Sequence, residues 1–479
     1  MPDICRPELQ KPLFVDLDGT LIRTDLLVES GFSLIKKNIL YLFLLPIWLL
    51  KGRAYLKQQI SDRVTIAPET LPYRQELIEL LREKRAAGCP LILITASPLN
   101  FANAVANHLG FFDDVLASDG NLNLKGSRKL DAIKRGMDGN RFDYAGDSKS
   151  DLKVWSEASR AIVVNPAPRL LRAVKALCDE VLVLNDRDRD RFRNYATALR
   201  LHHWLKNILV FVPLILAHRL DELALFVQAA VGFISFGLTA SSVYLLNDLL
   251  DLRSDRSHPS KRYRPLASGA IPIGHAVILI PALLLGAIFC ATALPGLFLI
   301  TLIGYFALTL AYSLRFKHAI ILDVIVLAAL YTLRLIGGAA ATTVIPSFWL
   351  LSFSMFLFLS LALVKRFSEL KLHTDRYAGV AVRGYTNDDL PMLSQLGSAS
   401  ALMSVLVLAL YINSDTVSVL YEHPQLIWMM CPLLLYLVSR IWLLAHRGKL
   451  DEDPVIFIIR DRRSHWLAVM GILLLWIAS

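Results

Sequence analysis

Two groups of closely spaced carboxylates are the residues best suited to do chemistry. The first is the turn DLDGT at residues 16–20, which ends a short apolar run. The second is the stretch NDLLDLRSD at residues 247–255, which follows a long apolar run. Clustered carboxylates repel one another, so this stretch is unfavourable unless cations occupy it. Mg²⁺ bridging to a diphosphate is the expected occupant, because it prefers oxygen ligands and shares them with substrate phosphates.

The elements that must position the first group follow an alternating pattern. Short apolar runs at residues 13–17, 91–95, 142–147 and 161–165 are typical of buried strands, and helical segments such as RQELIELLREKRAAG separate them. This pattern predicts βα repeats around a parallel sheet. Ligands bind at the carboxyl ends of the strands in such folds. We therefore expect the polar side chains at these ends to converge on one site, namely those of Asp16, Asp18, Thr95 and Asp147.

Over roughly residues 10–185 the sequence resembles the haloacid dehalogenase superfamily, which implies an α/β Rossmann-like domain with a helical cap. DLDGT matches the first motif, Thr95 the second, Lys129 in GSRKLDAI the third, and GDSKSD the fourth. The resemblance implies that Asp16 is the nucleophile and Asp18 the general acid/base. It also implies that Thr95 and Lys129 hold the phosphoryl oxygens.

A carboxylate nucleophile must attack a phosphorus that already carries negative charge, so a divalent cation and a lysine are needed to hold the anions together. The resemblance implies Mg²⁺ held by Asp16, Asp147 and the backbone carbonyl of Asp18, with Asp151 as a further ligand candidate. Dehalogenase-type members lack the second aspartate, so Asp18 favours a phosphatase. The alternatives are a plain acidic turn and a domain that kept its fold but lost catalysis, and four motifs in order speak against both.

The residues between the first and second motifs, about 22–88, resemble a helical cap inserted over the site. Within it, NILYLFLLPIWLL at 38–50 is apolar but contains Pro46 and is too short to span a bilayer. We expect it to lie in the headgroup region or, alternatively, to pack as a buried cap helix against the second domain. Basic residues flank it on both sides: Lys36, Lys37, Lys51 and Arg53.

The composition of the chain requires a membrane. Of its 479 residues, 55% are hydrophobic and 19% are charged, and the mean hydropathy is +0.48, which is too apolar for a soluble protein of this length. The long apolar stretches begin near residue 200. The net charge of +10 comes largely from short basic segments between these stretches. It therefore indicates membrane topology rather than nucleic-acid binding.

The amino end and the cysteines indicate the compartment of the first domain. The sequence MPDICRPELQKP lacks the basic-then-apolar order of a signal peptide, so we expect the first domain to stay in the cytoplasm. The five cysteines are scattered and form no CxxC motif, which predicts a reducing compartment and no structural zinc. We expect the phosphatase domain at 1–185, a charged linker at 186–198 and a transmembrane domain at 199–479.

Nine apolar segments predict an all-α membrane bundle of about nine spans. They lie near 205–217, 222–246, 272–293, 296–313, 319–341, 346–364, 393–413, 425–445 and 465–479. Alternate connecting loops carry roughly 17 Lys and Arg together, whereas the others carry about one, Arg219. By the positive-inside rule the basic loops are cytoplasmic, which puts the amino end inside and the carboxyl end outside and therefore requires an odd number of spans. We expect an integral protein of the cytoplasmic membrane.

The first basic loop contains the second group of carboxylates. The spacing predicts one helical face that carries Asn247, Asp248, Asp251 and Asp255. Such a face would bind Mg²⁺ and diphosphate unless it is merely a solvated loop. The cations that follow it can neutralise the rest of the leaving group. These cations are Lys261, Arg262 and Arg264.

The pattern NDxxDxxxD followed by KRxRPLASG resembles the UbiA superfamily of intramembrane prenyltransferases, over about residues 195–479. The resemblance implies a diphosphate that leaves carbon with the help of Mg²⁺, through a cation-like transition state. The protein would mainly supply electrostatic stabilisation and exclude water. A second site element is expected in YSLRFKHAIILDV, which offers Tyr312, Lys317 and Asp323.

The second, longer aspartate-rich stretch of quinone-forming members is absent, because Leu327 stands four residues after Asp323. The corresponding later loop has KRFSEL instead. The sequence resembles the decaprenyl-phosphate phosphoribosyltransferase branch in this loop and in three further segments, LRLHHWLKNILVFVP, YTLRLIGGAAAT and DEDPVIFIIRDR. The resemblance implies polyprenyl phosphate as acceptor and phosphoribosyl diphosphate as donor.

A buried cation at Arg334 needs an anionic partner, which we expect to be a phosphate, Asp323 or Glu369. Further phosphate-binding candidates are His203, Lys206, Lys317, Lys365 and Arg366.

Together these patterns predict a two-step enzyme. The transferase would make polyprenyl phosphoryl 5-phosphoribose, and the phosphatase would remove the 5-phosphate to give a precursor of surface glycans. One alternative is a prenyltransferase with an aromatic acceptor and an accessory phosphatase. Another is a membrane-anchored scaffold with decayed sites, against which the intact acidic motifs speak. The sequence leaves the oligomeric state open.

Overall fold

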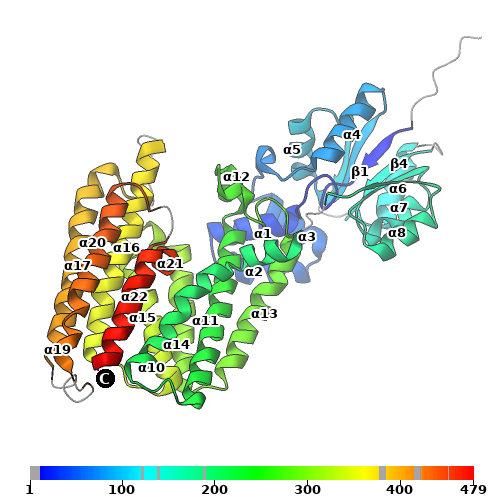
Figure 1. Ribbon diagram of the computed structural model, residues 1–479. Helices are drawn as coiled ribbons and strands as arrows, with labels where there is room; N and C mark the ends of the chain where they lie inside the picture. The colour runs from blue at the N-terminus through cyan, green and yellow to red at the C-terminus, as the bar shows by residue number, and fades with distance from the viewer. Residues whose placement is uncertain are drawn as a thin grey trace, which may run out of the picture. The chain divides into compact units, whose positions relative to one another are not determined.

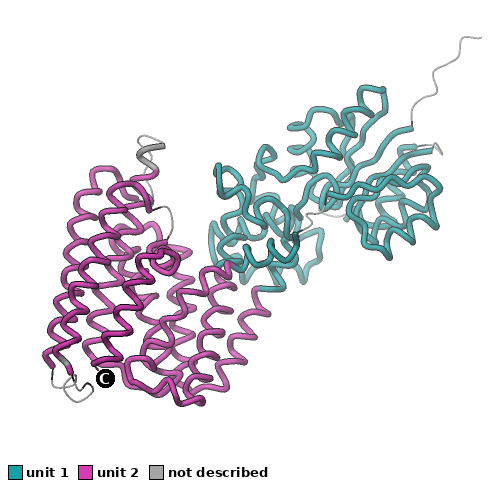
Figure 2. Tube along the Cα trace, viewed as in Figure 1, with its two compact units in different colours: residues 1–199, 244–279 teal, residues 200–243, 280–479 magenta. Residues whose placement is uncertain are grey.

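The computed structural model describes residues 11–119, 123–137, 141–186, 190–376, 384–414, 421, 423–450 and 453–478. The expected cytoplasmic start at 1–10 and part of the expected linker, 187–189, lie outside these ranges. The chain forms two compact units (Figure 2). The first, here called the sheet unit, comprises Met1–Leu199 and Tyr244–Leu279. The second, the helical unit, comprises Arg200–Val243 and Ile280–Ser479.

The sheet unit contains a six-stranded sheet in the order β3-β2-β1-β4-β5-β6, in which all pairs are parallel. Its strands are β1 (Leu13–Val15), β2 (Leu91–Pro98), β3 (Asp114–Ser118), β4 (Asp143–Gly146), β5 (Arg160–Val164) and β6 (Glu180–Leu184). The predicted parallel sheet is confirmed, and so are its four predicted strands. The edge strands β3 and β6 were not predicted, because most of their residues are only partly buried and form no continuous buried run.

Alternation along β1 builds two hydrophobic cores, one on each face of the sheet. Leu13 and Val15 point to one face, and Phe14 points to the other. The flanking helices are α4 (Gln75–Ala86), α5 (Leu99–Leu109), α6 (Ser127–Met137), α7 (Leu152–Trp155) and α8 (Pro168–Lys175). Both faces of β1 are therefore buried, which fixes the turn that follows it at residue 16.

The expected helical cap consists of α1 (Leu26–Lys37), α2 (Tyr41–Leu50) and α3 (Arg53–Ser61). Asp25 caps α1 by accepting hydrogen bonds from two backbone amides of its first turn. The cap has its own small core, formed by Leu34, Trp48, Ile60 and Val64. Most of α2 faces outward, and the side chain of Leu50 is 89% exposed. This apolar surface fits a helix that lies in the headgroup region of a membrane.

Three short helices and parts of two long helices complete the sheet unit. Its elements here are α9 (Arg191–Ala198), the end of α11 (Leu223–Leu250), α12 (Leu252–Ser257), η4 (Lys261–Tyr263) and the start of α13 (Ile273–Ala291). The acidic stretch at residues 247–255 therefore belongs to the same compact unit as the sheet and the cap.

The helical unit is a bundle (Figure 1). It includes α14 (Gly296–Leu314), η5 (Phe316–His318), α15 (Leu322–Thr342), α16 (Phe348–Arg376), α17 (Leu390–Ile412), α19 (Pro424–Ile427), α20 (Met430–His446), α21 (Pro454–Arg460) and α22 (Arg462–Ala478). α15 is the most deeply buried of the candidate spans. Tyr331 and Leu335 on α15 pack with Phe358 of α16 and Trp442 of α20 in one hydrophobic core.

Seven helices in the described ranges are long and apolar enough to cross a membrane, or eight if one bent pair is a single span. The protein is thus an integral membrane protein, but nine spans are not confirmed. The bent pair joins α9 to residues 201–216, which comprise η3 (Leu201–Phe211) and α10 (Val212–Leu216), with a bend of 49°. α22 has 17 residues, which at the helical rise gives about 26 Å. That is shorter than a hydrocarbon core of about 30 Å.

Small residues allow the helices of this unit to approach closely. A Cβ atom added to Gly397 on α17 would overlap the indole ring of Trp442 on α20. The same indole donates a hydrogen bond of 3.1 Å to Ser360 on α16. The glycine is therefore needed where three helices meet. In contrast, a Cβ atom added to Gly304 on α14 would have no neighbour within 4 Å.

We expect Gly397→Ala to lower the melting midpoint of the protein in detergent by several degrees. Inserting a methyl group into a well-packed site costs about 1–3 kcal/mol. Gly304→Ala is the matched control, and it should leave the midpoint unchanged or raise it, because alanine favours the helix. Equal midpoints for the two variants would contradict this packing.

Candidate active sites

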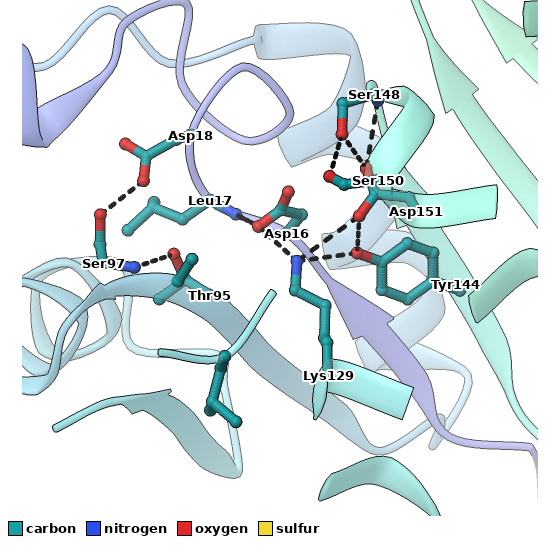
Figure 3. Close-up of polar contacts among 12 residues, drawn as sticks. Asp16, Leu17, Asp18, Thr95, Ser97, Lys129, Tyr144, Ser148, Ser150 and Asp151 are labelled. Carbon is teal, nitrogen blue, oxygen red and sulfur yellow. Dashed lines mark hydrogen bonds and ion pairs between the residues drawn. The ribbon is translucent and has the colours of Figure 1, made fainter. Parts of the chain in front are cut away.

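The first acidic turn is held by a buried lysine (Figure 3). Lys129 Nζ lies 2.9 Å from Asp16 Oδ1 and 3.7 Å from Asp151 Oδ1. The ammonium also donates a hydrogen bond of 2.9 Å to Tyr144 Oη, which in turn donates one of 2.9 Å to Asp151 Oδ1. Only 4% of the Lys129 side chain is exposed. The lysine therefore bridges the turn after β1 and the loop after β4 within a buried network.

The second aspartate of the turn has a separate set of partners. Asp18 Oδ2 accepts a hydrogen bond of 2.5 Å from Ser97 Oγ, and its Oδ1 accepts one of 2.8 Å from the backbone amide of Leu26. Thr95 Oγ1 accepts a bond of 3.0 Å from the Ser97 amide. The amide of Leu26 at the start of α1 and the hydroxyl of Ser97 in β2 therefore hold this carboxylate. Figure 3 shows its contact with Ser97, away from Lys129.

Three carboxylates form a group that fits a divalent cation. Asp16, Asp147 and Asp151 each offer an oxygen, and these oxygens lie within 4.8 Å of one another. Gly19 has φ +78°, and a Cβ atom there would overlap the carboxylate of Asp147. The turn therefore needs glycine both for its backbone and for space. Oxygen ligands of this kind suit Mg²⁺, which would neutralise the anionic oxygens of a bound phosphate.

Burial raises the pKa values of the carboxylates in this site. The pKa of Asp16 rises to about 6, because burial outweighs the opposing effect of Lys129. Burial raises the pKa of Asp18 to about 7, and it also raises that of Asp147 to about 7, with Asp16 and Asp151 adding repulsion. Burial lowers the pKa of Lys129, but the neighbouring carboxylates outweigh it and the net shift is upward. The site thus holds an excess of negative charge that a cation would stabilise.

Arg74 and Asp186 clamp the acidic turn from outside the motifs. Arg74 donates hydrogen bonds to the Gly19 carbonyl, of 3.0 Å from Nη2 and 3.3 Å from Nε, and pairs with Asp186. Asp186 also forms an ion pair of 2.8 Å with Arg23. Asp186, which joins these residues, was not predicted, because it follows the edge strand β6 and the sequence did not reveal that strand.

The structure brings together all six residues predicted for the first site, and their roles remain predictions. These are Asp16, Asp18, Thr95, Lys129, Asp147 and Asp151. Sequence reasoning missed Ser97 and Tyr144. Ser97 stands two residues after Thr95, and Tyr144 lies inside the predicted strand before Asp147, so position relative to the motifs was the available signal.

The sequence predicts one helical face for the second acidic stretch, but the structure divides this stretch between two helices. α11 ends at Leu250 and α12 begins at Leu252, so Asp251 stands at the break. The amide of Asp251 donates to the Asn247 carbonyl at 2.9 Å, and that of Asp255 donates to the Asp251 carbonyl at 2.8 Å. Local hydrogen bonds thus preserve the helical spacing while the helix axis breaks.

Basic side chains of the sheet unit neutralise this stretch. Arg264 Nη1 lies 3.2 Å from Asp248 and 2.7 Å from Asp255, both of which are buried. Asp251 pairs instead with Lys36 at the end of the cap helix α1, at 2.6 Å. The other two predicted cations, Lys261 and Arg262, are exposed. The carboxylates therefore already have cationic partners, Arg264 and Lys36, and Mg²⁺ bound to a diphosphate could take the place of these partners.

In the helical unit, two lysines share one carboxylate. Asp453 Oδ2 lies 2.6 Å from Lys206 Nζ and 3.0 Å from Lys365 Nζ. Tyr331 donates a hydrogen bond of 3.1 Å to Asp453 Oδ1, and its ring faces Lys206 and Arg334 at 5.5 and 5.6 Å. These five residues are called the Tyr331 cluster below. The sequence did not identify Asp453 as a site residue. The only local feature that marks it is its place before Pro454, as the N-cap of α21.

The expected carboxylate partner of Arg334 is wrong. Arg334 donates to Asn207 Oδ1 at 2.9 Å, to Tyr305 Oη at 2.8 Å and to the Leu330 carbonyl at 2.5 Å. Neutral acceptors and the Tyr305 ring, 4.9 Å away, therefore satisfy this guanidinium. The hydrogen bonds that Arg334 donates to these oxygens spread its charge over neutral groups.

The two carboxylates proposed for Arg334 bind Arg366 instead. Asp323 Oδ2 lies 2.5 Å from Arg366 Nη2, and both side chains are fully buried. Tyr385 donates to Asp323 Oδ1 at 2.6 Å, and Glu369 pairs with Arg366. Asp323 therefore supports a buried network. The remaining predicted residues are His203 in η3, Tyr312 in the last turn of α14 and Lys317 in η5.

Comparisons with known proteins match both parts of the chain. The model of the UbiA prenyltransferase family matches residues 208–475, and that of the haloacid dehalogenase-like hydrolases matches residues 13–155. An uncharacterized protein of Sinorhizobium fredii is 36% identical over 463 residues, which cover 96% of this chain and 89% of that protein. Nodulation protein NoeC of Azorhizobium caulinodans is 34% identical over 59% of this chain and 92% of its own length.

A third relative matches the carboxyl-terminal part. Decaprenyl-phosphate phosphoribosyltransferase of Mycobacterium tuberculosis is 34% identical over 196 residues, which cover 39% of this chain and 62% of that protein. Similarity to a named transferase is thus limited to part of each chain.

For the first site, we expect Asp18→Asn to lower kcat for p-nitrophenyl phosphate roughly 10²- to 10⁴-fold, because the general acid/base would be lost. Hydrolysis is measured on the full chain in detergent with Mg²⁺. Asp62→Asn, at the exposed residue that caps the carboxyl end of α3, is the control and should retain activity. Activity of Asp18→Asn equal to that of the control would exclude the role assigned to Asp18.

For the Tyr331 cluster, a double-mutant cycle of Lys206→Met and Asp453→Leu should show strong coupling. Asp453→Leu leaves the buried Lys206 ammonium without its carboxylate, which costs about 3–5 kcal/mol, whereas Lys206→Met leaves Asp453 paired with Lys365. The double variant should lose less stability than the two single changes added together, by at least about 1 kcal/mol. Unfolding in detergent micelles measures these differences.

The exposed pair Arg219 and Glu222 provides the control cycle, since both side chains are more than 40% exposed. Its coupling should be within about 1 kcal/mol of zero. Additive losses for Lys206 and Asp453 would show that this ion pair is not formed.

Proposed function

The chain belongs to the UbiA prenyltransferase family and carries a haloacid dehalogenase-like hydrolase domain, and we propose that it is a two-step enzyme acting on polyprenyl phosphate. Both domains identify an enzyme. In the proposed first step, the helical domain transfers 5-phosphoribosyl from phosphoribosyl diphosphate to polyprenyl phosphate. In the second, the hydrolase domain removes the 5-phosphate and leaves polyprenyl phosphoryl ribose.

The transfer step balances as a substitution at carbon. An oxygen of the lipid phosphate forms a bond to C1 of the ribose, while the bond from C1 to the diphosphate oxygen breaks and diphosphate leaves. Mg²⁺ held by Asp248, Asp251 and Asp255 would stabilise the charge of the departing diphosphate. Arg264 already lies beside two of these carboxylates and can contact the same phosphates.

One observation carries the choice of acceptor, namely the excess positive charge of the Tyr331 cluster. It holds three cations, Lys206, Arg334 and Lys365, against the single carboxylate of Asp453. When Arg366, Asp323 and Glu369 are included, four cations stand against three carboxylates. An anionic acceptor such as polyprenyl phosphate would offset this charge in an apolar bundle. A neutral aromatic acceptor, the alternative substrate, would not.

The hydrolase step uses the first site. The Asp16 carboxylate forms a bond to phosphorus, the bond from phosphorus to the ribose 5-oxygen breaks, and Asp18 donates a proton to that oxygen. Asp18 then accepts a proton from the water that hydrolyses the phospho-aspartate and releases phosphate. Lys129 stabilises the anionic oxygens beside Asp16. Burial raises the pKa of Asp18 to about 7 even though Ser97 and the Leu26 amide donate hydrogen bonds to it, and this pKa suits a group that gives up and takes back a proton.

The topology is also a proposal. We place the protein in the cytoplasmic membrane with the hydrolase domain at 1–185 on the cytoplasmic side, joined by a linker at 186–198 to the membrane domain at 199–479. The basic loops between apolar helices support this orientation. Both soluble substrates of the scheme, phosphoribosyl diphosphate and water, are available on that side.

We expect membranes containing the Asp16→Asn protein to accumulate polyprenyl phosphoryl 5-phosphoribose. They receive polyprenyl phosphate and phosphoribosyl diphosphate labelled in the ribose, and mass spectrometry of the lipid gives the product. Wild-type membranes should yield the lipid without its 5-phosphate. Asp248→Asn should abolish labelling of the lipid altogether, because the transfer step precedes hydrolysis.

An arm with labelled polyprenyl diphosphate and an aromatic acceptor separates the alternative. Label in a prenylated aromatic product, with no ribosylated lipid, would replace the proposed reaction. If the lipid is ribosylated but its 5-phosphate is lost equally from wild-type and Asp16→Asn protein, the transferase proposal stands and the hydrolase step fails.

A further inference from the structure

The cavity that contains the Asp16 and Asp18 carboxylates is far larger than a phosphate group. It lies within the sheet unit and has a volume of about 1200 Å³. Sites for small organic ligands measure about 300–1000 Å³. The cavity therefore has room for a substantial leaving group next to the scissile phosphate.

Part of this cavity is lined by the transferase sequence. Residues between Tyr263 and His275 contribute to its wall, and they lie within the stretch 208–475 that matches the UbiA family. This segment is called the 263–275 wall. Asn194 and Tyr195 of α9 line the cavity as well. The hydrolase motifs thus supply the reacting groups, while residues beyond the hydrolase domain supply further surface for the substrate.

A chain of polar contacts connects the 263–275 wall to the acidic turn. The Thr24 carbonyl accepts a hydrogen bond of 3.2 Å from the Gly19 amide, and the Thr24 hydroxyl donates one of 3.0 Å to Glu29. Glu29 forms an ion pair of 2.7 Å with Arg256, whose side chain is only 4% exposed. Arg256 Nε donates to the Ala267 carbonyl at 2.9 Å. A buried ion pair therefore anchors the wall to the hydrolase domain.

Close packing at Gly269 reinforces this anchor. Gly269 has φ +74°, and an added Cβ atom would lie 2.5 Å from Arg23 Cβ and 3.1 Å from the Arg23 carbonyl oxygen. Arg23 in turn pairs with Asp186 of the clamp on the acidic turn. The wall thus rests directly against residues that hold the catalytic turn, and a side chain larger than glycine would separate them.

The groups at this part of the cavity are suited to a sugar. Tyr195 Oη and His275 Nδ1 are hydrogen-bonded at 2.6 Å, and their rings are stacked at 19° with centroids 6.4 Å apart. Ser268 adds a hydroxyl to the lining. Hydroxyl and imidazole groups both donate and accept hydrogen bonds, and stacked rings offer a flat apolar surface. This combination matches the hydroxyls and the carbon face of a pentose.

We propose that Tyr195 and His275 form a leaving-group subsite of the phosphatase, which binds the pentose of a pentose 5-phosphate. The inference rests on the proposed hydrolase step and names the chemistry of its substrate. The two side chains would contact the pentose and not the reacting phosphorus, so they would determine specificity. The 263–275 wall makes the specificity of the hydrolase depend on the transferase sequence.

The test compares two phosphate monoesters that differ in the leaving group, ribose 5-phosphate and p-nitrophenyl phosphate, on the full chain in detergent. Tyr195→Phe and His275→Ala should each lower the ratio of kcat/KM for ribose 5-phosphate to that for p-nitrophenyl phosphate five- to tenfold. The loss should appear mainly as a higher KM for ribose 5-phosphate. Tyr195→Phe removes a single oxygen and preserves the ring, so it tests the subsite even if His275→Ala unfolds.

The matched control is His108→Ala. His108 stacks on Tyr73 at 18° with centroids 6.0 Å apart, and neither residue lines the cavity. For His108→Ala, the ratio of kcat/KM for ribose 5-phosphate to that for p-nitrophenyl phosphate should equal the wild-type ratio. A ratio unchanged in Tyr195→Phe, or lowered equally in His108→Ala, would overturn the subsite. Failure of the proposed transferase would appear instead as the absence of ribosylated lipid, which this assay does not measure.

Discussion

The electrostatic compensation of crowded, buried charges is the constraint on which the rest of this protein depends. Asp16 and Asp151 are tolerable together because Lys129 lies between them. Asp248 and Asp255 share Arg264 in the same way, although both are buried. In each case the compensation is partial, because burial penalises every charge and like charges remain close. A metal-bound phosphate or diphosphate would complete it, so under the proposed function the sites would be stabilised by their ligands.

The same principle ties the hydrolase domain to the acidic stretch of the transferase. Asp251 pairs with Lys36 of the cap, and Arg256 pairs with Glu29 in a largely buried contact. These contacts belong to one compact unit that crosses the limits of the two sequence families. Fusion alone would raise the local concentration of an intermediate. Shared ion pairs go further, since they give the two sites common structural elements.

The helical unit solves the problem of buried cations differently at two places. Arg366 forms ion pairs with Asp323 and Glu369, which compensate its charge. Around Tyr331 the cations outnumber the carboxylates, and aromatic rings and amide oxygens supply the remaining contacts. Such contacts are weaker than a full ion pair, and they leave positive charge available to an anion. This difference separates a supporting network from a candidate phosphate site.

The sequence by itself determined the two domains, the parallel sheet and the residues of the first site, because these depend on local patterns: apolar runs, acidic turns and motif order. It could not assign partners to charges. Arg334 was expected to pair with Asp323 or Glu369, yet Asn207 and Tyr305 bind it. Nor could it reveal Asp453, the break at Asp251 or the 263–275 wall. Each of these depends on segments far apart in the chain, and only tertiary packing decides which side chains meet and which buried charges are compensated.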